Sequence, residues 1–392
     1  MKKLISKYVG KLVEQGLAVS ESITFVCLDA EFSSNRGLEK VDPELIRVFD
    51  NININSLLYA EPAEPYKSII KQLARREHDF LLPNDCENRT FLHDIPLIPE
   101  LTSEAVSSAL SMRKAAIIGD SGIVSYGSVS PEQAFVSFSS VCFSTFVKFF
   151  TDVMYHLEDC RTGRTERDEE MISACLKIME SLDTEFHDCS VISEAPPRNE
   201  EEVIRQIVSA GRELTNRKLV DSYFGNISYT FGSSIYISQT GSSMDELAAC
   251  IDAVPLDGSS SSGITASSEL SAHLGIHSKT GLRAILHGHP KFTVIMSMSC
   301  RRDGCDISTC YRSCREARSA AGVPVVSGEI GTGPTGLVRT VPDAMTKSRA
   351  VIVFGHGIFT ADTDSFRPAF ELMQSVEKRC MQEYFKKIQG LI

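Results

Sequence analysis

Hydrophobic positions along this chain follow two different periods, and together they predict alternating helices and strands. In residues 3–17 apolar side chains recur three and four positions apart, which predicts an amphipathic helix. Residues 131–157 are rich in Phe and Val and predict a second, longer helix. Residues 225–241 instead alternate apolar and polar positions on either side of a Gly-Ser turn, which predicts a hairpin. The pattern indicates an α/β protein.

Two short apolar runs, each bounded by glycine or proline, predict buried strands that end in histidine. The first run, residues 284–286, is followed by His287 and His289, and the second ends at the glycine-flanked His356. Because strand side chains alternate between faces, His287 and His289 point from the same face. If both strands share a sheet, three imidazoles meet at one edge, which is a zinc-binding donor set. Neighbouring core or surface histidines are the alternative.

The length of the chain and one proline-containing linker predict two domains. A chain of 392 residues is long for one domain and sufficient for two hydrophobic cores. The best linker is 193–203, which contains two prolines and several charges and lacks an apolar run. We therefore expect a first domain over 1–192 and a second over 204–392.

The two halves also resemble each other. One strand-to-turn segment recurs at an offset of 235 residues (356 − 121), which places Ser121 opposite His356. A shorter offset, 225, sets residues 64–66 on residues 289–291. These matches predict a duplicated domain whose first copy is degenerate and has no metal site. Chance similarity between turns rich in small residues is the alternative.

Several short motifs follow one another in the second half: Gly225-Asn226, Thr240-Gly241, Ser267-Ser268-Glu269, His287 with His289, and His356. In this order they resemble the class II aldolase/adducin family, from about Ile204 to the C-terminus. The resemblance implies two related three-layer α/β/α domains, the first degenerate, and Zn²⁺ or another divalent transition metal. The implied site consists of a catalytic Glu269, the metal ligands His287, His289 and His356, and a phosphate-holding set of Gly225, Asn226, Thr240, Gly241, Ser267 and Ser268.

The resemblance also implies a reaction. Glu269 would take a proton from the carbon beside a metal-bound carbonyl, or return it, and the metal would stabilise the enediolate. The expected activity is a lyase of carbohydrate metabolism that cleaves a small, phosphorylated hydroxy-carbonyl compound. A dehydratase, decarboxylase or epimerase on the same fold and a non-catalytic, adducin-like scaffold are alternatives. Taken alone, Glu269 is also an ordinary helix-starting acid after two serines. The family's proton-donating tyrosine has no match, since only Tyr311 and Tyr384 follow His289.

The composition limits which kinds of partner the protein is expected to bind. A net charge of −11 argues against nucleic acid and anionic membranes, and we expect no membrane-spanning run. Twelve scattered cysteines without a secretory signal indicate reduced thiols in a cytoplasmic protein.

Other histidines and cysteines receive structural interpretations. His273 and His277, four residues apart, are expected on a helix face, with one of them placed behind the metal ligands. The spacing of Cys300, Cys305, Cys310 and Cys314 matches no zinc-ribbon pattern, so structural thiols are favoured over a second metal site. The family implies a homo-oligomer, in which a dimer of duplicated chains supplies four domains.

Overall fold

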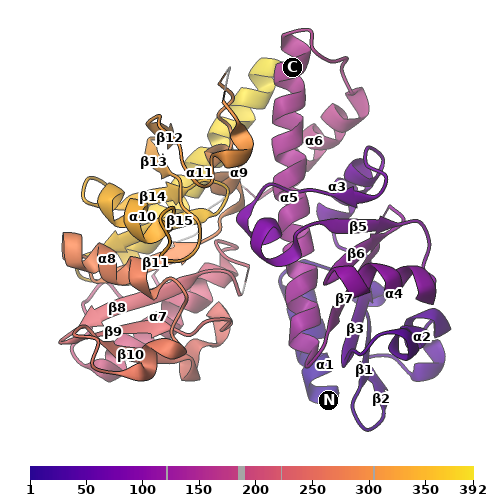
Figure 1. The fold of residues 1–392 in the computed structure, drawn as a ribbon, viewed down its shortest axis with the longest axis horizontal. Coiled ribbons are helices and arrows are strands. Elements are labelled where there is room, and N and C mark those ends of the chain that lie inside the picture. The colour runs from indigo at the N-terminus through magenta and orange to yellow at the C-terminus, as the bar shows by residue number, and fades with distance from the viewer. Residues whose placement is uncertain (121, 184–189, 222, 303–304) are drawn as a thin grey trace. The chain divides into compact units, whose positions relative to one another are not determined.

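The computed structural model divides the chain into two compact units, Met1–Leu182 and Asp183–Ile392 (Figure 1). The residues it describes are 1–120, 122–183, 190–221, 223–302 and 305–392. Ser121, the predicted counterpart of His356, lies outside them. The expected linker, 193–203, falls within the second unit, where its last residues already belong to helix α7 (Glu200–Asn216).

The first unit is built on one sheet, which has seven strands among the residues described, in the order β2-β1-β3-β7-β6-β5-β4. Its strands are β1 (Thr24–Leu28), β2 (Phe32–Ser34), β3 (Ser56–Ala60), β4 (Phe80–Leu81), β5 (Ile95–Ile98), β6 (Ala115–Ile118) and β7 (Gly122–Gly127). Its helices are α1 (Lys2–Glu14), α2 (Pro43–Asn51), α3 (Tyr66–Ala74), α4 (Ser103–Met112), α5 (Pro131–Arg161) and α6 (Glu169–Ser181).

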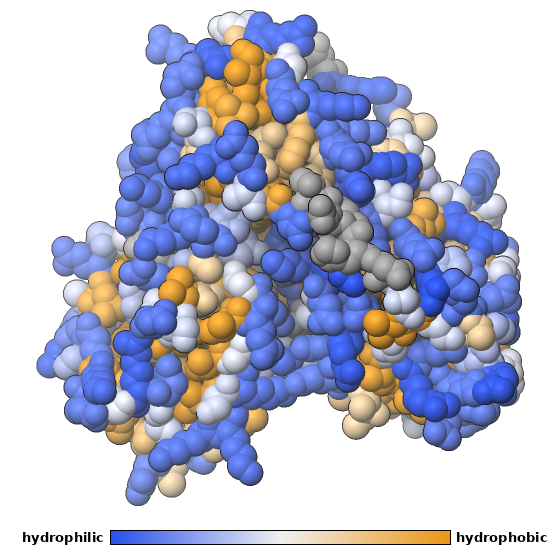
Figure 2. All heavy atoms as spheres, turned by 180° about the vertical axis from the view of Figure 1, so that it is seen from behind, coloured by the Kyte–Doolittle hydropathy of each residue, from blue (hydrophilic) through white to orange (hydrophobic). Residues whose placement is uncertain are grey.

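Helices cover both faces of this sheet. α2 and α4 pack on one face around a buried cluster that includes Val26, Val48 and Leu110. α1, α3 and α5 form the other layer, with α5 against β3 and β7. α5 is long and apolar enough to span a membrane, contrary to the expectation that no run is, but 89% of its most apolar window is buried. It is a core helix. On the face in Figure 2 hydrophilic residues predominate and hydrophobic ones form separate patches.

The second unit has an eight-stranded sheet over its described residues, in the order β10-β9-β8-β11-β15-β14-β13-β12. Its strands are β8 (Asn226–Phe231), β9 (Ser234–Ser238), β10 (Ile251–Pro255), β11 (Ala284–Gly288), β12 (Arg318–Ala320), β13 (Val323–Val326), β14 (Ala350–Val353) and β15 (Gly357–Asp362). Its helices, besides α7, are α8 (Leu270–Thr280), α9 (Lys291–Ser297), α10 (Leu337–Met345) and α11 (Phe366–Leu391).

This unit has three layers as well. α8 and α10 pack on one face around Ile276, Val341 and Phe359, while α7, α9 and α11 cover the other face. The predicted hairpin is confirmed as β8 and β9, paired antiparallel. The two histidine-terminated strands share one sheet, because β11 and β14 both pair with β15. The predicted three-layer α/β/α fold class is confirmed for both units.

The two units repeat one topology. Apart from β10, the strand orders correspond one to one, and the single parallel pair lies at the equivalent place in each described sheet, β5 with β6 and β13 with β14. The register corrects one predicted match. Tyr59 pairs with Val124 as His287 pairs with Phe359, so Tyr59 stands in the place of His287 and the offset is 228, not 225. The dipeptide Glu-Pro occurs twice after β3, and the match in the sequence aligned its second occurrence, instead of its first, with residues 289–290.

Candidate metal centre

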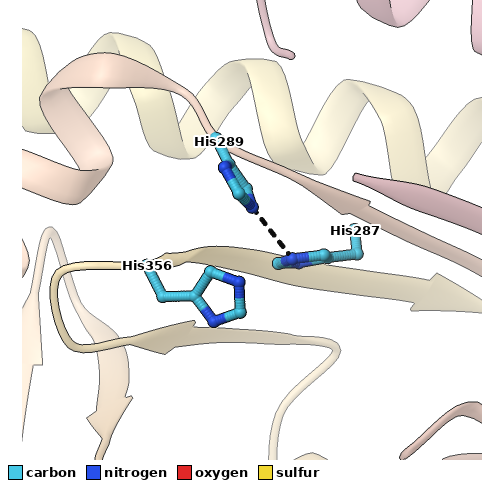
Figure 3. Close-up of side chains that lie close together, drawn as sticks. All are labelled: His287, His289 and His356. Carbon is cyan, nitrogen blue, oxygen red and sulfur yellow. Dashed lines mark hydrogen bonds between the residues drawn. The ribbon is translucent and has the colours of Figure 1, made fainter. Parts of the chain in front are cut away.

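Three imidazoles converge where β11 and β14 end (Figure 3). His287 is the penultimate residue of β11, His289 follows that strand, and His356 lies in the turn between β14 and β15. All three side chains are buried, and their ligand atoms lie within 4.8 Å of one another. The Nε2 atoms of His287 and His289 are 3.1 Å apart. The predicted convergence on one strand edge is therefore present.

Two glycines let the backbone come close enough for this convergence. A Cβ on Gly357 would lie 2.4 Å from the carbonyl oxygen of Gly288 and 2.7 Å from Cδ2 of His289, so no side chain fits. Gly225 has φ +135°, and its Cβ would meet the carbonyl oxygen of His287 at 2.7 Å. Gly357, next to His356, and Gly225, next to Asn226, thus allow neighbouring segments to touch the strand that carries His287.

Neighbouring groups fix the orientation of His287 and the charge of His289. Nδ1 of His287 lies 3.1 Å from the carbonyl oxygen of Ile358, and because a carbonyl only accepts, Nδ1 donates to it and Nε2 is the ring atom that faces the other histidines. The ring of Phe359 stacks on this imidazole at 4.1 Å, which fixes its plane. Burial, together with the neighbouring His287, lowers the pKa of His289 well below its usual range. His289 is therefore neutral at physiological pH.

Glu269 faces the same point from the first turn of α8, where it is the N-cap residue. Its carboxylate oxygens lie 3.4 Å from Nε2 of His287 and 3.6 Å from Nε2 of His356, and only 4% of the side chain is exposed. Four ligands at about 2.0–2.1 Å from a tetrahedral ion are separated by about 3.3 Å. The separations of 3.1, 3.4 and 3.6 Å are close to this value, so these atoms lie near enough to one another to surround one ion.

A chain of buried hydrogen bonds leads away from Glu269. Nδ2 of Asn226 donates to Oε2 of Glu269 at 2.9 Å, Oδ1 of Asn226 lies 2.5 Å from Nε2 of His273, and Nδ1 of His273 lies 2.6 Å from Oγ of Ser228. Desolvation, with a smaller effect of His287, lowers the pKa of His273 to about 3. The sequence placed His273 on a helix face and missed Ser228. The only signal in the sequence for Ser228 was the alternation of side chains along β8, which puts Asn226 and Ser228 on one face.

The residues expected to hold a phosphate lie in two adjacent loops and beside Glu269. Gln239 and Ala266 form a bridge, and Thr240 Oγ1 donates to the carbonyl of Ala266 at 2.9 Å. This brings the Thr240-Gly241 loop against the Ser267-Ser268 loop, where Thr240, Gly241 and Ser268 are exposed and Ser267 is buried. Asn226 is only 5% exposed, and both ends of its amide contact the side chains named above.

Other candidate residues lie elsewhere. His277 bonds through Nδ1 to the carbonyl of Leu282 at 2.9 Å, at the end of α8. Tyr384 is fully buried on α11 against Phe292. Tyr311 follows the short turn before β12. The cysteines that the structure describes, with Cys300, Cys305, Cys310 and Cys314 among them, are free thiols.

A three-layer α/β/α unit with three buried imidazoles and a carboxylate at one strand edge has the donor set of a transition-metal domain. Residues 205–384 match the family model "Class II Aldolase and Adducin N-terminal domain". Over these residues the chain is similar to that family, as the motif order indicated. Among curated proteins, none matches this chain.

Several solved structures are similar to about half of the chain. L-fuculose-1-phosphate aldolase from Thermus thermophilus is 22% identical, with 48% of this chain and 96% of that chain covered and a TM-score of 0.39. An aldolase II superfamily protein from Pseudomonas syringae is 19% identical, with 48% and 75% covered and a TM-score of 0.37. Sugar-phosphate aldolase from Thermotoga maritima is 16% identical, with 48% and 96% covered and a TM-score of 0.34.

Proposed function

We propose that this protein is a metal-dependent lyase of the class II aldolase type that cleaves a small, phosphorylated hydroxy-carbonyl compound. The observation that carries the proposal is the approach of Glu269 to within 3.4 and 3.6 Å of two imidazoles of a buried three-histidine cluster. A scaffold protein without activity has no need to hold a carboxylate and three imidazoles around one point in its interior, because burying such groups costs free energy.

His287, His289 and His356 would hold the ion, with Zn²⁺ the first choice for three imidazoles and an open fourth position. Bound there, the ion supplies a Lewis acid that polarises a carbonyl oxygen. Magnesium or calcium prefers oxygen ligands and fits this nitrogen-rich set poorly.

Glu269 would move the proton. In the direction of bond formation its carboxylate takes a proton from the carbon beside the carbonyl, and in the direction of cleavage it returns that proton. The N-terminus of α8 stabilises the negative charge of the carboxylate at this position. Asn226 holds Oε2 by a hydrogen bond, so Oε1 remains available to the substrate.

The loops beside Glu269 would bind the phosphate. The backbone N–H groups of Thr240 and Ser267 bond to the carbonyls of Thr265 and Ser238. The backbone N–H groups of Gly241 and Ser268 and the hydroxyls of Ser267 and Ser268, in two adjacent turns, would be the neutral donors that an anion binds. Gly225 would let Asn226 sit close to the metal centre, and the second N–H of the Asn226 amide is a further phosphate donor. A homo-oligomer and a cytoplasmic location belong to the same proposal.

The test combines metal analysis with a lyase assay. We expect purified protein to contain a transition metal, and His356→Ala to lower metal content and cleavage of ketose 1-phosphates at least about tenfold. His78→Ala, which removes an exposed histidine of the first unit, is the matched control and leaves both unchanged. A wild-type protein that takes up no zinc, or a His356→Ala protein that keeps it, would refute the proposal.

A further inference from the structure

The hydrogen bonds behind Glu269 have one consistent set of directions. An ionised carboxylate only accepts, so the atom of Asn226 at 2.9 Å from Oε2 is its amide nitrogen. The amide oxygen then faces Nε2 of His273 at 2.5 Å and must receive a proton from it. Nδ1 of His273 is left with a lone pair, which accepts from the hydroxyl of Ser228 at 2.6 Å.

We infer that His273 is a positioning residue for the reaction: together with Ser228 it fixes the orientation of the Asn226 amide, which in turn holds the carboxylate of Glu269 against the three histidines. Every link except Glu269 is neutral. The chain therefore orients the carboxylate without neutralising its charge, whereas a lysine or arginine in the same place would neutralise it.

The orientation of the amide is the step on which this depends. If the Asn226 amide turned over, its oxygen would face Oε2 of Glu269 at about the same distance, and two acceptors repel each other. The N–H of His273, directed at Oδ1, opposes that turn from the other side. Loss of this N–H would release Glu269 from its place 3.4 Å from Nε2 of His287.

The backbone shows that the chain is built into the fold. Asn226 pairs with His287 across β8 and β11, so the amide and the imidazole ligand stand on neighbouring strands at the same level of the sheet. Ser228 follows two residues along β8 on the same face. His273 lies one turn after Glu269 on α8 and is fully buried. The strand β8 and the helix α8 are thus joined through the side chains of Asn226, Ser228 and His273.

His277 does not share this role, although it is spaced from His273 as His273 is from Glu269. It is half-buried, and its Nδ1 bonds to the backbone carbonyl of Leu282, just beyond the end of α8. The same residue type on the same helix therefore provides a matched control.

The experiment compares His273→Leu, His273→Gln, Ser228→Ala and the control His277→Gln. Leucine fills the site without a donor, whereas the side-chain amide of glutamine can donate to Oδ1 of Asn226. We measure Zn²⁺ affinity by competition with a chelator, the melting temperature, and kcat and KM separately. Removing a side chain that orients a metal site lowers metal affinity about 10- to 100-fold.

We expect His273→Leu to lower Zn²⁺ affinity and kcat by this factor with KM little changed, His273→Gln to restore both, and Ser228→Ala to give a smaller loss. If His273→Leu does not fold, Ser228→Ala is read against His277→Gln. If His273→Leu, His273→Gln and Ser228→Ala all lost the same melting temperature but kept the Zn²⁺ affinity and kcat of the wild type, the inference would be overturned.

The inference rests on the proposed function for the role of Glu269, but the two fail differently. A wild-type protein that binds no Zn²⁺ removes the proposed function. A wild-type protein that binds Zn²⁺, with His273→Leu and Ser228→Ala binding it equally well, removes only the positioning role.

Discussion

Gly357→Ala should damage the metal centre although residue 357 is not itself a ligand. The added Cβ would lie 2.4 Å from the carbonyl oxygen of Gly288, 2.7 Å from Cδ2 of His289 and 3.0 Å from Cε1 of His287. Ordinary contacts of a Cβ begin at 3.4 Å, so the first two fall short by about 1.0 and 0.7 Å. One of these neighbours belongs to the backbone of β11 and cannot rotate away.

The magnitude follows from what must move. Forcing an extra methyl group into a close-packed site costs about 1–3 kcal/mol of folding stability. Sites of this kind tolerate displacements of about 0.5 Å, and the imidazole of His289 must move further than that. We therefore expect Zn²⁺ affinity to fall at least about tenfold, which corresponds to about 1.4 kcal/mol.

The assay pairs urea unfolding of the metal-free protein with chelator competition for Zn²⁺. Gly390→Ala is the matched control, because it lies on α11 with nothing within 4 Å of its added Cβ and improves helix propensity. If Gly357→Ala bound Zn²⁺ as tightly as the wild type and unfolded at the same urea concentration, the close approach of β15 to β11 would not be what shapes the centre.

Two further predictions concern protonation. The pKa of His273 is lowered to about 3 in the fold, against about 6.5 in the unfolded chain, so below pH 6.5 the unfolded chain binds a proton that the folded one does not. The free energy of unfolding of the metal-free protein should therefore fall by up to about 1.4 kcal/mol per pH unit between pH 6.5 and 3. In urea unfolding from about pH 7.5 to 4.5, the free energy of His273→Leu should depend less steeply on pH than that of the wild type. Equal pH dependence in the two proteins would contradict the lowered pKa of His273. Exposed Cys305 should react with iodoacetamide in the native protein, whereas burial raises the pKa of Cys27 to about 12 and should protect it; mass spectrometry of the labelled peptides decides.

Much of the centre was predictable because local patterns determine it. Strands that end in glycine-flanked histidines are recognisable by their short apolar runs, and the alternation of strand side chains put His287 and His289 on one face. The sequence did not show whether the two strands belong to one sheet, and the convergence of the histidines depended on it. The structure shows that they do, because β11 and β14 both pair with β15. The α/β class followed from the alternation of helices and strands, whereas the three layers followed from the family resemblance.

The hydrogen-bond chain behind Glu269 was not predictable, since it joins residues far apart along the sequence. Asn226 was assigned to a phosphate by resemblance, and nothing local shows that its amide lies between Glu269 and His273, 43 and 47 residues further on. The sequence likewise could not separate His273 from His277. Both have helical spacing, and only burial in the fold distinguishes them.

The comparison of the two units shows where the chemistry resides. Asp42 is the N-cap of α2 as Glu269 is the N-cap of α8, and Tyr59 occupies the place of His287 on the equivalent strand. Two residues after Tyr59 stands Glu61, whose carboxylate pairs with Nζ of Lys67 at 2.6 Å. One framework thus presents an ion pair in the first unit and three imidazoles in the second. Because strand order and layers are shared, the fold alone assigns neither unit a reaction, and the side chains at these positions must.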